Sequence, residues 1–389
     1  MNSPAAIAAL FLLCAASLAA QQPAHGARPA RAPRAAAVPA VAPAEVARLL
    51  GALADDSLEG RDTGSRGSAA AARIIAAELR AAGAWPAGDS GYFQRVPVAR
   101  TTVTAQGRTR TRIVLLPDLA AADTLTAASR LPVVAVNVVG VLPGRDPQLR
   151  GEAVVVSAHY DHLGIGQPVN GDSIRNGAVD NASGVATMLA IADAFTRSGL
   201  RPKRTLIFVG MALEESGLLG SAWLAAHPPV PPAKVAADLN LDVTNLFGAT
   251  RDISAVGADQ STLGRFFEAA ARAERLRVVV DSVALSHGSF FRADHFSFAK
   301  AGVPAMTPGN SYDFVGKPAG WGRQQKDIYD RERYHQPADN LLSWYTVDGA
   351  VQQARVLALV AWNVAEAVGQ PSWYPTSEFA VAGRQRIAR

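Results

Sequence analysis

The sequence predicts an α/β protein with a single globular domain, in which a mixed, mostly parallel twisted sheet is flanked by helices. Short apolar runs rich in valine alternate with amphipathic helical patterns along most of the 389 residues. Such alternation is typical of a sheet covered by helices on both faces. The composition, 49% hydrophobic and 18% charged, is that of an ordinary globular protein and excludes a fibrous or wholly disordered chain.

The N-terminal 43 residues are expected to lie outside the folded domain. Residues 5–20 form an apolar run that is too short to span a membrane comfortably and ends in small residues. This pattern predicts a signal peptide over residues 1–20, cleaved after Ala19 or Ala20, and hence a secreted or periplasmic protein with no stable membrane anchor. Residues 21–43 contain mostly Ala, Pro and Arg and are typical of a disordered leader.

The expected elements of the folded domain, residues 44–389, follow one another without a repeat or a composition shift that would mark a second domain. Helices are predicted over 44–54, 68–82, 183–196, 218–226, 261–275 and 351–368. Strands are predicted over 94–98, 112–116, 133–141, 154–158, 205–211, 236–242 and 278–281.

Charge and cysteine content exclude several classes of site. The formal net charge of +5 comes from arginines spread along the chain, so nucleic acid is not an expected partner. The densest basic cluster, Arg108, Arg110 and Arg112, alternates with threonines and indicates the solvent face of an edge strand. The only cysteine, Cys14, falls inside the predicted signal peptide. Any metal site in the mature chain must therefore use His, Asp and Glu.

The stretch 154–164 is the first candidate site. Its apolar residues indicate a buried strand, which ends in His159, Tyr160, Asp161 and His162. In α/β folds, functional groups gather at the carboxyl ends of such strands. His159 and Asp161 are two residues apart, so in extended backbone both side chains point the same way. A carboxylate that holds the far nitrogen of an imidazole is typical of a metal-bound histidine, although a surface pair capping the strand would have the same sequence.

Five more acidic or histidine residues follow other predicted elements. Asp180 lies in a small-residue turn, Glu214 and Glu215 follow a buried strand, Asp242 ends another strand, and His335 lies in a loop. Taken singly, each has a structural explanation as a helix cap, a solvated acid or a turn residue. Together at one sheet edge, these carboxylates would be costly to bury without cations. Imidazole and carboxylate are ligands that zinc accepts.

Several segments, in this order, resemble the zinc aminopeptidases of peptidase family M28. They are residues 53–64, 157–164, 177–184, 214–221, 240–242, 294–305 and 335–339. The resemblance covers most of the chain and implies the zinc-exopeptidase fold. The protease-associated insertion common in this family is not expected, because only about fifty residues lie between Gln94 and the end of the strand that follows Val133.

The resemblance implies two zinc ions per chain and the removal of N-terminal residues from peptides or proteins. The implied ligands are His159, Asp180, Glu215, Asp242 and His335. Asp180 would bridge the ions, with His159 and Glu215 completing one ligand set and Asp242 and His335 the other. Glu214 would be the general base for a metal-bridging water, and Asp161 would orient His159.

Other residues have open interpretations. Tyr312 could donate its hydroxyl to the developing oxyanion, or it could be a core tyrosine. Four aromatic residues could line a side-chain pocket or simply pack: Phe290, Phe291, Phe314 and Trp321. His287 and His295 could support the site from behind the ligands. The remaining histidines, at positions 25, 162 and 227, are expected to be structural or solvated.

Four alternatives to an M28 aminopeptidase fit the sequence less well. An M20-like dipeptidase or carboxypeptidase has ligands in a similar order, but it carries a lid domain for which the stretch between Asp242 and His335 has no room. A glutaminyl cyclase uses a single zinc ion, whereas the ligand set here is complete for two. A non-catalytic binding module on the same fold would have lost ligands. A serine hydrolase is unsupported because no Gly-Xaa-Ser-Xaa-Gly elbow follows a strand.

Overall fold

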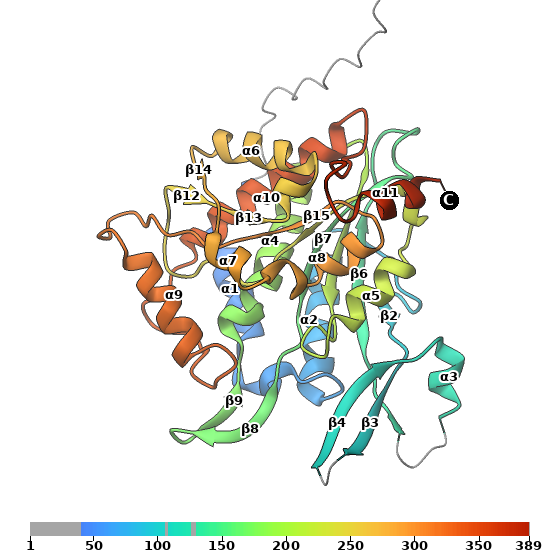
Figure 1. The fold of residues 1–389 in the computed structure, drawn as a ribbon, viewed down its shortest axis with the longest axis vertical. Helices are drawn as coiled ribbons and strands as arrows, with labels where there is room; N and C mark the ends of the chain where they lie inside the picture. The colour runs from blue at the N-terminus through green and yellow to red at the C-terminus, as the bar shows by residue number, and fades with distance from the viewer. Residues whose placement is uncertain (1–39, 106–107, 126–129, 389) are drawn as a thin grey trace, which may run out of the picture. The chain divides into compact units, whose positions relative to one another are not determined.

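An eight-stranded mixed sheet forms the centre of the computed structural model, which describes residues 40–105, 108–125 and 130–388 (Figure 1). The strand order is β1-β6-β10-β7-β11-β15-β13, and β2 also pairs with β6. The four consecutive strands β10, β7, β11 and β15 are parallel, and the strands on either side are antiparallel to them. The bounds are β1 Trp85–Pro86, β2 Phe93–Arg95, β6 Val136–Leu142, β7 Ala153–His159, β10 Thr205–Met211, β11 Val235–Asn240, β13 Ala255–Val256 and β15 Ala305–Pro308. The predicted fold class is confirmed.

Each face of the sheet packs against its own set of helices. Val154 and Val156 of β7 belong to a large apolar core shared with α1 Pro43–Leu53, α2 Arg66–Ala81, α4 Ser183–Arg197, α6 Leu263–Ala273 and α10 Asp348–Glu366. Val155, between them, belongs to a smaller core on the opposite face with α5 Leu219–Ala226 and α8 His295–Lys300. Because successive side chains of a strand alternate between faces, a continuous apolar run such as β7 is what a sheet buried on both faces requires.

Three smaller sheets lie outside the central one. β4 Arg108–Leu115, β3 Val98–Ala105 and β5 Arg130–Pro132 form an antiparallel sheet in which β4 is an edge strand. Arg110 and Arg112 are exposed there, as the alternation with threonine predicts. β8 Gly164–Val169 pairs with β9 Asp172–Arg175, and β12 Asp252–Ile253 pairs with β14 Arg277–Val278.

The structure differs from the predicted elements mainly in short segments. The strand predicted over 278–281 is β14, Arg277–Val278, and Asp281 instead caps α7 Ser282–Ser286 by accepting hydrogen bonds from the N–H groups of Val283 and Ala284. The elements not predicted include β8, β9, α7, α8, β15, α3 Leu119–Asp123, α9 Trp321–Glu332 and α11 Ala380–Ile387. Most of these are eight residues or shorter, too short for apolar periodicity to distinguish them.

The predicted signal peptide, Cys14 and nearly all of the predicted leader lie outside the described residues. The first helix, α1, begins at Pro43. Among the described residues, none of the helices combines the length and apolar character needed to cross a membrane.

Candidate metal centre

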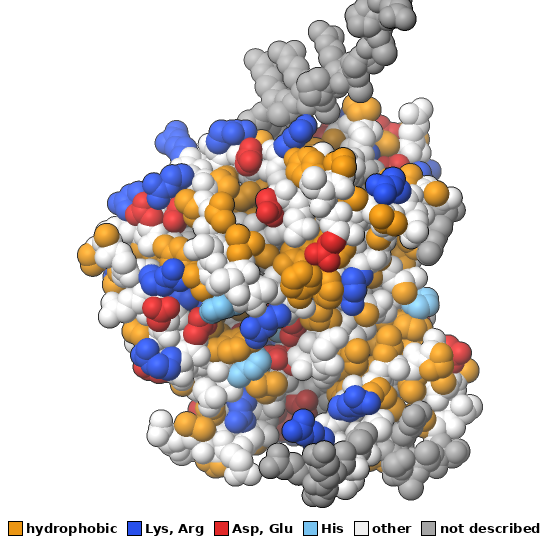
Figure 2. Space-filling model, in the orientation of Figure 1, with side chains coloured by type: hydrophobic (Ala, Val, Ile, Leu, Met, Phe, Trp, Pro, Cys, Tyr) orange, Lys and Arg blue, Asp and Glu red, His pale blue; other side chains and the backbone are white. Residues whose placement is uncertain are grey.

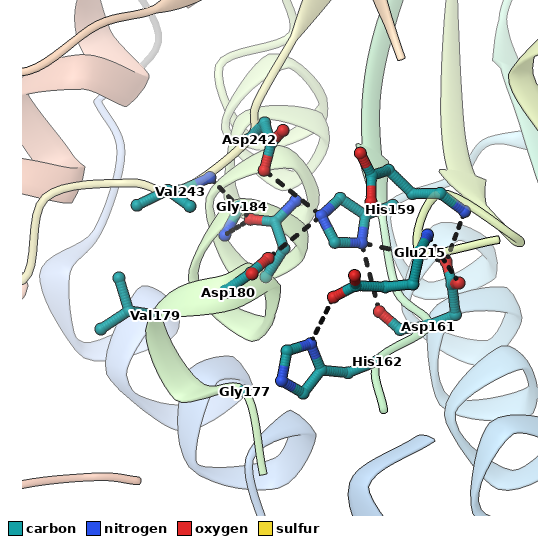
Figure 3. A network of polar contacts seen from close by, with 12 residues as sticks. His159, Asp161, His162, Gly177, Val179, Asp180, Gly184, Glu215, Asp242 and Val243 are labelled. Carbon is teal, nitrogen blue, oxygen red and sulfur yellow. Dashed lines mark hydrogen bonds and ion pairs between the residues drawn. The ribbon is translucent and has the colours of Figure 1, made fainter. Parts of the chain in front are cut away.

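The candidate site lies at the carboxyl ends of three adjacent parallel strands. β7 is entirely buried and ends at His159. The Nε2 atom of His159 lies 3.3 Å from Oδ1 of Asp180 and 3.2 Å from Oδ1 of Asp242 (Figure 3). Its other nitrogen, Nδ1, lies 3.2 Å from the carbonyl oxygen of Asp161. A carbonyl can only accept a hydrogen bond, so Nδ1 carries a proton. Nε2 then donates to the two carboxylates when the ring is charged, and offers its lone pair to a cation when the ring is neutral.

Asp161 connects two strands instead of holding His159 through its carboxylate. Its two carboxylate oxygens accept hydrogen bonds from the N–H groups of Glu214, at 3.1 Å, and Glu215, at 3.3 Å. The distance from Oδ1 of Asp161 to Nδ1 of His159 is 3.8 Å, longer than a hydrogen bond. Asp161 therefore orients His159 through its backbone carbonyl, and its side chain fixes the turn that carries the two glutamates.

Asp180 is held in a tightly bonded turn between β9 and α4. Its N–H group donates to Oδ2 of Asp339, and that of Val179 donates to Oδ1, both at 3.0 Å. Asp339 lies four residues after His335, so one acid fixes the Asp180 turn to the loop that carries His335. A Cβ atom at Gly177, whose φ is +55°, would meet the Asp180 carbonyl oxygen at 2.1 Å. Asp339 belongs to the segment 335–339 that resembles the family, but no role was predicted for it.

Glu214 and Glu215 follow β10, on the other side of β7 from Asp242. Oε1 of Glu215 lies 2.7 Å from Nδ1 of His162, and Oε2 lies 3.3 Å from Nε2 of His335. His335 also lies 3.2 Å from Oδ2 of Asp180. Figure 3 shows Asp180 between the ring of His159 on one side and that of His162 on the other.

The side chains form two groups that share Asp180, and these groups correct the expected pairing of ligands. The first group is His159, Asp180 and Asp242, and the second is His162, Asp180 and Glu215. His159 was expected to share an ion with Glu215, and Asp242 with His335. The sheet order explains the difference: Asp242 follows β11, which lies beside β7, whereas Glu215 follows β10 on the opposite side and turns toward His335.

His162 was expected to be structural or solvated, and the structure places it in the centre. Its side chain is fully buried, and no hydrogen-bond partner of its Nε2 atom is present among the described residues. Its ring lies edge-on to that of His335, with centroids 5.5 Å apart. The sequence did carry a signal for this placement: His162 lies three residues beyond His159, directly after the same strand end.

The charges of the centre favour cations between the carboxylates. Burial opposes ionisation of Asp180, but hydrogen bonds from His159 and His335 outweigh burial and hold the pKa of Asp180 well below its usual range. Burial also disfavours the charged form of His335, but its hydrogen bonds to Asp180 and Glu215 raise its pKa to about 9. Positive charge is thus required here, as protons on imidazoles or as cations. Imidazole and carboxylate donors that lie within 4.8 Å of one another suit zinc.

A cavity of about 370 Å³ opens beside the centre. His159, Asp180, Glu214 and Asp242 line one side of it. Burial raises the pKa of Glu214 well above its usual value, and neighbouring carboxylates, including Asp242, add to this. The remaining wall includes His287, Ser289, Arg292, Thr307, Asn310, Lys326, Tyr329, Asp330 and Tyr334.

The structure does not bring Tyr312 into this cavity, which corrects its expected catalytic role. The Tyr312 hydroxyl lies 3.2 Å from Oδ1 of Asp281, and the Arg323 guanidinium lies over its ring. Tyr334 lines the cavity instead, with its ring stacked on His335 at a centroid distance of 3.8 Å. The sequence does not show which of these two tyrosines lines the cavity, because that depends on where α9 packs.

The other aromatic and histidine candidates fall into different environments. Phe290 packs with Phe379 in an apolar cluster, and the exposed Phe291 packs against Phe290; neither lines the cavity. His295 is buried against Phe290. The remaining two aromatic pocket candidates, Phe314 and Trp321, pack against each other, and neither lines the cavity. His287 lines the cavity. His227 stacks on Trp223, while His25 lies outside the described residues.

Comparisons with known proteins find relatives that include zinc metalloproteases. The chain is 29% identical to leupeptin-inactivating enzyme 1 of Streptomyces exfoliatus over 53% of this chain and 43% of that one. It is 27% identical to a probable zinc metalloprotease of Pyrenophora tritici-repentis over 62% of this chain and 59% of that one. The chain spans about half the length of the curated relatives it matches.

Among solved structures, the fold resembles that of BSAP, a zinc aminopeptidase from Bacillus subtilis. The TM-score is 0.54 at 14% identity, covering 82% of this chain and 94% of that one. The model of peptidase family M28 matches residues 137–358, which include both ligand groups. This chain therefore belongs to peptidase family M28.

Proposed function

We propose that this chain is an exported di-zinc aminopeptidase. The observation that carries the proposal is the position of Asp180 between two ligand groups, beside a cavity that another acid, Glu214, lines without belonging to either group. Relatives named zinc metalloprotease and leucine aminopeptidase support the choice of metal and of reaction. A binding module would not need a free carboxylate beside a complete ligand set.

His159 and Asp242 would hold one ion and Glu215 and His335 the other, with Asp180 shared between them. When bound, the two ions would acidify the attacking water and polarise the scissile carbonyl. Hydrogen bonds from the Glu214 and Glu215 N–H groups to Asp161 keep the turn after β10 in place, so that Glu215 faces the ligand group while Glu214 faces the cavity.

Glu214 is the proposed proton carrier. Its carboxylate would accept the proton of the attacking water and donate it to the leaving amine. Glu214 lines the cavity beside both ligand groups, where its carboxylate would reach the attacking water and the leaving amine. Tyr334 is the proposed hydrogen-bond donor to the oxyanion, because it lines the cavity and its ring stacks on His335.

The test combines zinc content with turnover in the same preparations. Glu214→Gln should retain the zinc content of the wild type and lose activity on aminoacyl p-nitroanilides by roughly 10²–10⁴-fold, the contribution of a general base. Asp180→Asn should instead lower the zinc content. Glu378→Gln, an exposed glutamate on the C-terminal segment, is the matched control and should change neither quantity.

Two outcomes would contradict the proposal. Near-normal turnover by Glu214→Gln would contradict the role of Glu214 as general base. An Asp180→Asn variant that still binds two zinc ions would contradict the role of Asp180 as bridging ligand. N-acetylated substrates should resist the wild type, and their cleavage would argue against an aminopeptidase. Export is proposed from residues 5–20 alone, and the N-terminal sequence of the protein from a cell envelope or medium fraction tests it.

A further inference from the structure

Arg292 is a cation on the wall of the cavity that no acid among the described residues neutralises. It lines the cavity together with His159, Glu214 and Asp242. The other wall cation with a long side chain, Lys326, forms an ion pair with Asp330 one helical turn further along α9. No ion pair or side-chain hydrogen bond of Arg292 is present in the described part of the chain. In Figure 2, basic, acidic and histidine side chains are interspersed on the face between α9 and α8.

The backbone that carries Arg292 is held in place on both sides. Its N–H group donates to the carbonyl oxygen of Ser289 at 3.2 Å, and the neighbouring Ala293 is buried. Phe290 is anchored in the apolar cluster with Phe379. Arg292 therefore presents its guanidinium from a fixed segment, so less conformational freedom is lost when it binds a partner.

The charge of Arg292 acts on the side of the cavity that contains the metal centre. Arg292 lines the same cavity as the expected ligands His159 and Asp180 and as Tyr334, whose ring stacks on His335. A peptide that fills this cavity therefore meets both the ligand groups and Arg292.

We propose that Arg292 binds a carboxylate of the substrate, which makes short or acidic peptides the preferred substrate class. This inference rests on the proposed aminopeptidase function. The proposed zinc ions would neutralise the carboxylates of the centre, and Lys326 neutralises Asp330. A carboxylate of the substrate is therefore the partner available to Arg292. A volume of about 370 Å³ is at the small end for a ligand pocket and suits a short peptide segment.

Two kinds of substrate present this carboxylate: a short peptide through its C-terminus, and a longer one through an acidic side chain next to the scissile bond. The experiment compares Arg292→Gln with the wild type on four substrates. Ala-Ala and Ala-Ala-amide differ only in the C-terminal carboxylate. The p-nitroanilides of glutamate and glutamine differ only in the side-chain carboxylate. Arg265→Gln, an exposed arginine of α6 outside the cavity, is the matched control.

The wild type should favour one carboxylate-bearing member of a pair over its neutral partner, and Arg292→Gln should abolish that preference. The expected loss in kcat/KM is roughly tenfold to a hundredfold, mainly through KM, as for a hydrogen bond to a charged group. The neutral substrates should be hydrolysed as before, and Arg292→Lys should restore part of the preference. The pair that responds identifies the source of the carboxylate.

Three results would overturn the inference. The wild type could show no preference in either pair, Arg292→Gln could keep the preference, or it could slow all four substrates equally, as a purely structural residue would. Hydrolysis of the neutral substrates separates these failures from failure of the proposed function. A wild type that cleaves none of the four would refute the aminopeptidase and this inference together.

Discussion

Arg61 supports the metal centre from a segment outside the residues that match the family model. Its guanidinium is 1% exposed and donates four hydrogen bonds to backbone carbonyl oxygens. The acceptors are Leu53 at 2.6 Å, Tyr160 at 2.8 Å, Asn176 at 2.5 Å and Gly177 at 3.1 Å. Three of these four carbonyls belong to the two loops that carry the histidines after β7 and Asp180.

Replacing Arg61 with Met removes all four hydrogen bonds but keeps an unbranched side chain. Hydrogen bonds to a charged group are each worth about 1.5–3 kcal/mol, so their gross loss is about 6–12 kcal/mol. Burial lowers the pKa of Arg61 to about 10, which shows that the buried charge is itself unfavourable, and the variant recovers that cost. We therefore expect the free energy of unfolding to fall by about 3–5 kcal/mol. Zinc affinity should fall roughly 10–100-fold, as for other residues that orient ligands.

Urea unfolding of the zinc-free protein and calorimetric titration with zinc measure the two effects separately. Arg204→Met is the matched control, because Arg204 is also 1% exposed and donates to the carbonyl oxygens of Val364 and Ala367, away from the centre. It should lose comparable stability but bind zinc normally. A loss below about 1 kcal/mol in Arg61→Met, or zinc affinity equal to that of Arg204→Met, would refute the reasoning.

Three further predictions concern buried groups near the centre. His162→Gln should weaken zinc binding at the Glu215 side, so that stoichiometry at limiting zinc falls from two toward one; an unchanged isotherm would contradict this. Burial lowers the pKa of His295 to about 3. Below about pH 6.5 the unfolded chain therefore binds a proton at His295, whereas the folded chain does not, so the free energy of unfolding should fall as the pH drops from about 6.5 to about 3. Between pH 8 and pH 5, urea unfolding should show a loss about 2 kcal/mol greater in the wild type than in His295→Gln, and equal losses would exclude this origin. Gly177→Ala should destabilise the protein by at least about 1 kcal/mol, because its φ is +55° and a Cβ atom would contact Asp180 and the His162 ring; unchanged thermal unfolding would contradict this.

The central elements could be predicted from sequence because their signals are local. The apolar run before His159 is continuous because β7 is buried on both faces, and the long apolar periodicity of residues 351–368 matches α10. Glu214 and Glu215 follow the next such run. Strand identity and the residues at strand ends therefore required no knowledge of neighbours in space.

The partners of those residues were decided only by the tertiary structure. Whether His159 faces Asp242 or Glu215 depends on β11 and β10 lying on opposite sides of β7, and no local pattern encodes that order. The choice of Tyr334 over Tyr312 depends on the packing of α9, whose sequence is mostly polar. Hydrophobic periodicity reports which face of an element is buried, whereas contacts between elements far apart in the chain arise only when the sheet is assembled.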